Sequence, residues 1–352
     1  MLPRFDDELV GVRHALAPTR RKRFAVNPRQ EAVDRLGGAY EARVLEPSPP
    51  PVTEGQWLAD DPAARGTSPD GKPIVSPVTS GDVTWDELCG GDPALAAWCA
   101  DRWLGGWRPL PPLPPRDELA STRRAWHTLA EHVLARARYD ANGKIGLRFT
   151  RGGVGTPWFR RASADMQVRI ERTSVVVHRG DVTDAAAITN VAAAAELARI
   201  EPGAPADVYT PTTPLAPDAA LNLDAGAADF LGAWFGFATS ILEQLRAEAD
   251  RRDEPSRVQL WPEHFDLSFD LGDEAAGGRG TFGASPGDDN HADPYLYVTH
   301  WGDVPDDAYW KETHFAGARF SVVRLADASD QRAAALEFFR RGRELLRAAS
   351  SP

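Results

Sequence analysis

Hydrophobic and polar positions change their spacing along the chain near residue 140. From Asp117 to Tyr139, apolar residues recur at the three- and four-residue spacing of an amphipathic helix, and Asn142 and Gly143 follow as a stop signal. Immediately downstream, from Ile145 on, apolar and polar residues alternate, as in a strand with one buried face. The pattern therefore predicts a long helix that leads into a β-sheet.

The same two periods predict the elements of the rest of the chain. Strands are expected at Met166–Glu171, Ser174–His178, Val258–Trp261, Glu263–Leu271, Thr281–Ala284, Pro294–Trp301 and Ala318–Leu325. Helices are expected at Asp184–Ile200, Asp224–Ala249 and Ser329–Ala348. Because strands follow one another through turns and helices come in blocks, we expect an α+β fold, with a largely antiparallel sheet packed with helices.

The first part of the chain lacks this patterning. Residues 1–81 contain a basic run at 20–23 and a proline cluster at 47–51, with weak apolar periodicity, so we expect a flexible arm. Residues 82–350 are expected to form a single α+β domain. The proline-rich run at 108–116 lies inside it and is expected to be a stiff connector, because polyproline II is an extended, semi-rigid conformation.

Composition narrows the class of protein. A hydrophobic fraction of 42% is ample for a core, and two cysteines cannot make a disulfide framework. The 40 basic and 51 acidic residues give a net charge of −11, which argues against binding to nucleic acid or to anionic membranes. No signal-peptide pattern begins the chain, and the longest uncharged run, Phe230–Leu242, is too short to span a membrane. We therefore expect a cytoplasmic protein.

Nearly all of the acidic excess lies in one stretch. Between Pro262 and Glu312 there are twelve acidic residues and only two basic ones. Within the expected strand Glu263–Leu271, alternation places His264 and Asp266 on one face and the large apolar residues on the other. An imidazole and a carboxylate at this spacing can converge on one ion.

Two further histidines lie downstream in the same acidic stretch. His291 stands in a loop rich in aspartate, and His300 ends the next expected strand. We therefore predict that His264, Asp266, His291 and His300 are candidate ligands of a divalent metal. Mixed imidazole and carboxylate ligation would suit Zn, Mn or Fe, whereas the loop carboxylates alone would suit Ca or Mg.

Two hypotheses for function follow. In the first, the protein is a metal-supported or acid/base enzyme that acts on a small polar substrate. His264, Asp266 and His300 would then be ligands or proton-transfer groups, and Lys144 would contact an anion or the substrate. In the second, a non-catalytic binding protein uses the acidic face to meet a basic protein partner. Two alternatives remain for the acidic stretch: a plain, solvated outer sheet face, and a carboxylate-lined pocket for a cationic ligand.

Residues 283–287 match the G-x-S-x-G pattern of a nucleophile elbow around Ser285. The oxyanion hole of an elbow uses the backbone N–H of the residue after the serine, and Pro286 has none. The segment is better explained as a turn, with proline at its second position and glycine at its third. We therefore do not expect a serine hydrolase.

Four segments taken together resemble an uncharacterised family of bacterial proteins, common in high-GC genomes, that is known only as a domain of unknown function. They are residues 143–147 (GKIGL), 261–267 (WPEHFDL), 284–288 (ASPGD) and 294–298 (PYLYV), the last running on to His300 and Trp301. The resemblance covers about residues 120–347. It implies a shared architecture, and it implies no activity, cofactor or site residue.

Overall fold

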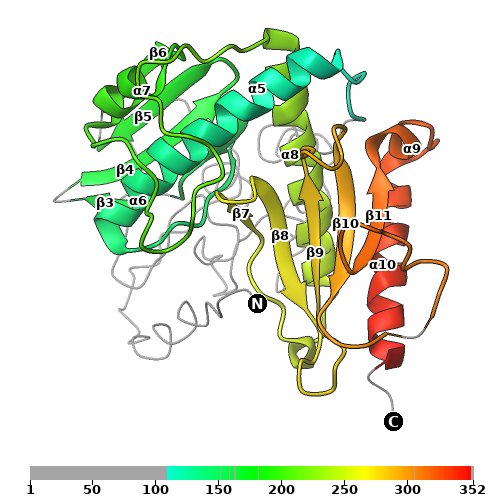
Figure 1. The fold of residues 1–352 in the computed structure, drawn as a ribbon. Helices are drawn as coiled ribbons and strands as arrows, with labels where there is room; N and C mark the ends of the chain where they lie inside the picture. The colour runs from blue at the N-terminus through cyan, green and yellow to red at the C-terminus, as the bar shows by residue number, and fades with distance from the viewer. Residues whose placement is uncertain are drawn as a thin grey trace, which may run out of the picture.

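The structure is a computed structural model that describes residues 109–349, except for residues 151, 158, 162–163, 181 and 305 (Figure 1). The arm expected at residues 1–81 and the domain boundary at residue 82 lie outside the described residues. Helices and antiparallel sheets make up the described part, so the predicted α+β class is confirmed. The strands are divided between two sheets, whereas the sequence pattern predicts a single sheet.

The first sheet has six strands in the order β1-β2-β4-β5-β6, with β3 also paired to β4. Its pairings are all antiparallel. The strands are β1 (Arg148–Thr150), β2 (Gly153–Gly155), β3 (Phe159–Arg161), β4 (Ala164–Glu171), β5 (Ser174–Arg179) and β6 (Val182–Ala187).

The helix expected at Asp184–Ile200 was wrong in its first half. Residues there form β6, which pairs with β5 along its whole length, and the cross-strand ladder overrides the high helix propensity of the alanines. Helix α7 (Val191–Ala198) begins only after Asn190, whose side chain caps it by accepting the N–H of Ala193 at 2.8 Å.

The second sheet is a five-stranded meander in which each strand pairs with the next along the chain. Its strands are β7 (Gln259–Trp261), β8 (Asp266–Leu271), β9 (Gly280–Ser285), β10 (Tyr295–His300) and β11 (Gly317–Ser321). The two sheets meet at one bridge, where Leu147 and Leu260 exchange both backbone hydrogen bonds at 2.8 Å. We call this junction the seam.

Helix α8 (Ala225–Ala247) lies at the centre of the molecule and contacts both sheets (Figure 1). It begins where expected, because Asp224 accepts the N–H of Ala227 and caps it. By length and composition alone α8 could cross a membrane, but 78% of its most apolar stretch is buried inside the protein. Side chains such as Trp234 and Phe235 are fully buried, so the core explains the apolar character of the helix.

The long helix predicted at Asp117–Tyr139 is confirmed as three consecutive segments. They are α5 (Arg116–Leu129), the π-helical turn η4 (Ala130–Leu134) and α6 (Ala135–Asn142). Gly143 ends the helix in the left-handed region, with φ 73°. In the described part of the proline-rich run, Leu110 donates its N–H to Gln331 at 2.8 Å, so this stretch is attached to the domain.

The π-helical turn η4 carries two buried polar side chains that hold the loop between α7 and α8. The carboxylate of Glu131 accepts the backbone N–H groups of Thr212 and Thr213 at 2.9 and 2.8 Å. His132 accepts the N–H of Ala204 on Nδ1 at 3.0 Å, so its Nε2 carries the proton and donates to the carbonyl oxygen of Thr213. These bonds fix a proline-rich loop that has no regular structure of its own.

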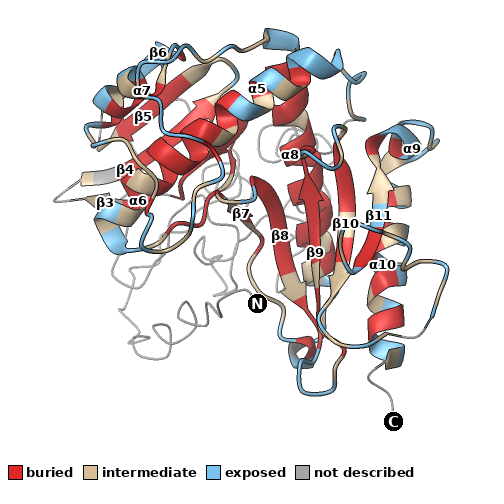
Figure 2. Ribbon diagram, viewed as in Figure 1, coloured by how far each residue is buried: buried red, intermediate tan, exposed pale blue. Residues whose placement is uncertain are grey.

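The strand expected at Ala318–Leu325 ends at Ser321, whose side chain caps the short helix α9 (Val322–Ala326). Helix α10 (Gln331–Ala349) follows, as predicted. With α8, it covers one face of the second sheet and buries Phe269 and Phe282 there (Figure 2). The opposite face of this sheet carries the candidate site.

Candidate functional site

The segment that the sequence predicted as one strand, Glu263–Leu271, starts with a turn. Residues 262–265 form the turn, and β8 begins at Asp266. Phe265 has a left-handed backbone, with φ 53°, and its ring lies stacked on His127, 5.0 Å between centroids. The turn leaves His264 exposed, whereas Asp266 is buried with 7% of its surface exposed. His264 and Asp266 are therefore neighbours in the chain without sharing a strand face.

Polar side chains line the face of the second sheet opposite α8 and α10. The strand register aligns Asp266 with Ser285 and Tyr295, and Ser268 with Gly283 and Tyr297. We call this the outer polar face, defined by Asp266, Ser268, Ser285, Tyr295 and Tyr297.

The outer polar face is buried at β8 and β9. It is therefore not the solvated acidic face that the sequence allowed as an alternative. Asp266, Ser268 and Ser285 expose only 7%, 4% and 5% of their surface. The long loop between β10 and β11 covers part of this face, because Phe315 packs against the rings of Tyr295 and Tyr297, at 6.5 and 5.9 Å between centroids. Carboxylate and hydroxyl groups are thus held in a largely dry environment.

Tyr297 reaches across the sheet from β10 to β8 and donates its hydroxyl hydrogen bond to Asp266. Its ring can pass over β9 because residue 283 is glycine; a Cβ there would lie 2.3 Å from Cζ of Tyr297. Burial raises the pKa of Asp266 above its usual range, against the opposing effects of His264 and the Tyr297 hydrogen bond. The second carboxylate oxygen, Oδ1, is buried without a hydrogen-bond partner.

Tyr295 connects the outer polar face to the loop between β9 and β10. Its hydroxyl donates to Asp288, and Oδ1 of Asp288 accepts the backbone N–H groups of Asn290 and His291, both at 2.7 Å. Arg123 on α5 donates to the carbonyl oxygen of Ala292 at 3.0 Å and so ties this loop to the helix. The loop therefore has a defined conformation that positions His291.

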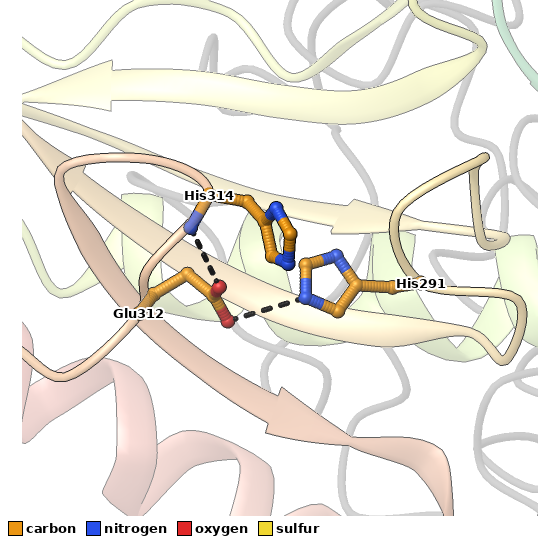
Figure 3. A group of neighbouring side chains, drawn as sticks. All are labelled: His291, Glu312 and His314. Carbon is orange, nitrogen blue, oxygen red and sulfur yellow. Dashed lines mark hydrogen bonds and ion pairs between the residues drawn. The ribbon is translucent and has the colours of Figure 1, made fainter.

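His291, Glu312 and His314 come together beside Tyr295, and we call them the His–Glu cluster (Figure 3). Nε2 of His291 lies 3.4 Å from Oε2 of Glu312, and one ligand atom from each of the three residues lies within 4.8 Å of the others. The two imidazole rings meet edge to face, 4.9 Å between centroids. His291 comes from the loop after β9 and the other two from the loop before β11, so the cluster joins distant parts of the chain.

Glu312 is ionised throughout the neutral range. Burial alone would raise the pKa of this carboxyl, but the N–H of His314, the Arg319 guanidinium and the N–H of Thr313 outweigh burial and lower the pKa to about 2. The bonds are 3.0, 2.7 and 2.8 Å long. An ionised carboxylate is the form that binds metal.

The donor set and spacing of the His–Glu cluster fit a divalent transition metal. Ligand atoms placed about 2.1 Å from a tetrahedral ion lie about 3.4 Å apart, which is the present separation of His291 from Glu312. His314 is exposed, and its ligand atom lies within 4.8 Å of the other two, so it would need to approach by at most about 1.4 Å. Nδ1 of His291 is buried and has no hydrogen-bond partner. It lies 3.8 Å from Oδ1 of Asp288, on the side of the ring where a carboxylate commonly orients a metal-binding imidazole.

The residues predicted from the sequence do not share one centre. His291 belongs to the His–Glu cluster, and Asp266 belongs to the outer polar face. His264 lies in the turn next to Asp266, close enough to affect its pKa. Lys144 directly follows Gly143, which ends the helix, and lies three residues before Leu147 of the seam.

His300 lies away from the other predicted site residues for a reason the sequence already contained. In β10 it alternates with Tyr295 and Tyr297, so it falls on the opposite face from them, at the far end of the strand from Asp266. Its Nδ1 donates to the carbonyl oxygen of Gly302 at 2.7 Å, and its ring packs edge to face on Trp310. The expected convergence of His264, Asp266 and His300 on one ion therefore does not occur.

Sequence reasoning missed four residues of the site. Tyr295 and Tyr297 could have been found, because period-two spacing places both hydroxyls on one face of β10. Glu312 and His314 carry no such signal, since they stand in a long irregular loop. Only the pairing of β11 with β10 brings that loop onto the outer polar face.

Comparisons with known proteins do not identify a function for this site, so its function has to be inferred from its geometry. No protein-family model, no curated protein and no solved structure matches the chain. The resemblance to a bacterial family of unknown function therefore rests on its four segments alone. Three of these segments meet on the outer polar face, where they supply Asp266, Ser285, Tyr295 and Tyr297.

Proposed function

We propose that this protein is a cytoplasmic, metal-supported acid/base enzyme that acts on a small polar substrate at the outer polar face. The observation that supports this most is the His–Glu cluster, in which one carboxylate and two imidazole ligand atoms lie within 4.8 Å of one another. Two histidines and one carboxylate suit Zn, Mn or Fe(II) and leave coordination positions open for water or substrate. Such a metal would polarise the substrate or lower the pKa of bound water.

Residues of this chain would have distinct tasks around that centre. Asp288 lies 3.8 Å from Nδ1 of His291 and would orient the imidazole once the two came within hydrogen-bond distance. Asp266 and Tyr297 form a buried pair that holds one proton between a carboxylate and a phenol, and burial raises the pKa of both groups. A buried pair of this kind is suited to proton transfer, because small changes in its surroundings move the proton.

Arg319 is the competitor of the metal in this proposal. Its Nε donates to Oε2 of Glu312 at 2.7 Å, and this is the oxygen that faces His291. Metal binding would have to weaken or displace this ion pair. Replacing Arg319 by glutamine should therefore raise the affinity for metal, whereas loss of a ligand lowers it.

The test is metal binding by the untagged, chelator-treated protein, measured by calorimetric titration with Zn(II) and Mn(II). We expect one site per chain, a loss of affinity of at least tenfold in His291→Ala and His314→Ala, and a gain in Arg319→Gln. His264→Ala is the matched control, since His264 is an exposed histidine of the same acidic segment outside the cluster. Absence of binding, or equal loss in the His264 control, would reject the metal centre.

A second outcome bears on the alternative function. If the protein binds no metal, the acidic residues of this region are better explained as a surface for a basic protein partner. If it binds metal but Asp266→Asn and Tyr297→Phe leave every metal-dependent activity unchanged, the acid/base part of the proposal is wrong.

The resemblance supports a further part of the proposal. Because three of its four segments meet on the outer polar face, we propose that this face is what the chain has in common with that bacterial family. The structure of a member of that family would test this, and a member whose counterparts of Asp266, Tyr295 and Tyr297 do not meet on one sheet face would contradict it.

A further inference from the structure

Strand β6 forms the outer edge of the first sheet, at the end opposite the seam (Figure 1). It pairs with β5 along its whole length, and no other described strand pairs with it. The outer edge of the second sheet, β11, is partly covered, because Glu312 donates its N–H to the carbonyl oxygen of Gly317 at 3.1 Å. Arg319 also lies in β11, and a charged residue at an edge discourages pairing with another chain.

The sequence of β6 lacks the features that usually protect an exposed edge. The strand reads VTDAAA, with no lysine, arginine or proline. Its single charged residue is Asp184, whose Oδ2 lies 2.5 Å from Nη1 of Arg179 in the same chain. Val182 is 56% exposed, and Ala185 and Ala186 are both exposed although their side chains point to opposite faces. A strand of this kind is a template for pairing with another strand.

The hydrogen-bond pattern of β6 shows which of its backbone groups point outward. Ile188 donates its N–H to the carbonyl oxygen of Thr173 at 2.9 Å, and the register of β5 and β6 continues from this pair. Hydrogen-bonded and non-hydrogen-bonded positions alternate in an antiparallel pair, so the even-numbered residues of β6 bond to β5. The N–H and C=O groups of Thr183, Ala185 and Ala187 therefore point away from β5. Among the described residues, none is hydrogen-bonded to these outward groups.

A second copy of this chain fits the edge in one antiparallel register. A twofold axis at residue 184 or 185 aligns five residues of each strand, whereas an axis at residue 183 or 186 aligns only three. An axis at Asp184 would place two like charges opposite each other, which is unfavourable. An axis at Ala185 instead places Asp184 opposite the partner's Ala186. Three pairs of outward residues then exchange two bonds each, which gives 3 × 2 = 6 hydrogen bonds.

We propose that the protein forms a twofold-symmetric dimer through β6, in which the first sheets of two copies join into one continuous sheet. Two chains that each carry a net charge of −11 repel one another. β6 is a place where they can approach, because Arg179 neutralises its one charge and its alanines are small. This proposal does not depend on the proposed function, since the outer polar face and the His–Glu cluster belong to the second sheet and its loops.

Sedimentation equilibrium of the full chain tests the dimer, at concentrations up to about 200 μM and in about 0.15 M salt, which screens long-range repulsion. We expect a monomer–dimer equilibrium in the wild type. Ala185→Pro removes one outward N–H from each chain and leaves the bonds to β5 intact, so it should weaken the dimer at least tenfold. Ala185→Val is the matched control, because valine keeps the N–H and suits a strand; it should keep the dimer.

Two lysine variants test the register and keep the experiment decisive if Ala185→Pro does not fold. In Ala185→Lys, like charges lie opposite each other at the axis, and the dimer should weaken about fivefold. In Ala186→Lys, the same charge lies opposite the partner's Asp184, so the dimer should be at least as strong as in the wild type.

Two results would overturn the proposal. The first is a monomer at every concentration, which includes the case that residues 1–108 of the same chain occupy this edge. The second is a dimer that Ala185→Pro and Ala185→Lys weaken no more than their controls, because the contact would then lie elsewhere on the molecule.

Discussion

Gly283 lies beneath the ring of Tyr297, and Gly283→Ala tests whether the bond between Tyr297 and Asp266 depends on this close approach. The new Cβ would lie 2.3 Å from Cζ and 2.5 Å from the hydroxyl oxygen of Tyr297. Carbon atoms in contact lie about 3.5–4.0 Å apart, so the ring would have to move by more than about 1 Å. Overpacking of a buried site in this way costs about 1–3 kcal/mol.

The displaced ring would also withdraw the hydroxyl donor from Asp266. This carboxylate is buried, and its other oxygen already lacks a partner. Loss of a hydrogen bond to a charged buried group costs about 1.5–3 kcal/mol. The two effects together predict that Gly283→Ala lowers the free energy of unfolding by about 2.5–6 kcal/mol, a large part of the total stability of an ordinary domain.

The assay is a double-mutant cycle by urea denaturation, with Tyr297→Ala as the second change. Without the ring above it, alanine at residue 283 should cost less than about 1 kcal/mol, so the coupling energy between the two positions should exceed about 1.5 kcal/mol. If the two changes add to within about 0.5 kcal/mol, the ring and Gly283 are independent and the reasoning is refuted.

Three other changes give further predictions. Because burial raises the pKa of Asp266, ionisation of this carboxyl opposes folding above its unfolded pKa of about 3.9. Asp266→Asn should therefore gain stability relative to wild type between pH 4 and pH 7, measured by urea titrations. A stability difference that does not change with pH would contradict this. Glu131→Ala should cost about 2–4 kcal/mol and speed amide exchange at Thr212 and Thr213, which full protection would disprove. Phe265→Ala should cost about 3–5 kcal/mol by calorimetry, and a cost under 1 kcal/mol would show that its ring is not core.

The spacing of apolar residues correctly predicted most of the helices and strands that keep one regular period along their length. In β8, alternation identified Leu267 and Phe269 as the buried apolar face. It could not show that Asp266 on the other face is buried too, because the cover comes from a loop about fifty residues later in the chain. Phe265 has a left-handed backbone conformation, which separates His264 from the strand. Glycine or asparagine usually occupies such a position, so a phenylalanine gives no sign of it in the sequence.

The candidate site was predictable only in part, for a related reason. His291 was identified from its acidic surroundings, but its partner Glu312 was not, because their approach depends on how two irregular loops fold over the sheet. The error at His300 had a different cause. Period-two alternation in β10 places His300 on the face opposite Tyr295 and Tyr297, so its nearness in sequence to the acidic loop does not bring it to the site.

The central position of α8 has a consequence for how the molecule comes apart. Both sheets pack against α8, in which Trp234 and Phe235 are fully buried, and among the described residues a single backbone bridge joins the two sheets directly. Neither sheet can melt without exposing apolar surface that the other needs, so the described part of the chain should unfold as one cooperative unit. Damage at the outer polar face would then be reported by the same transition as damage in the first sheet, although the two regions lie in different sheets.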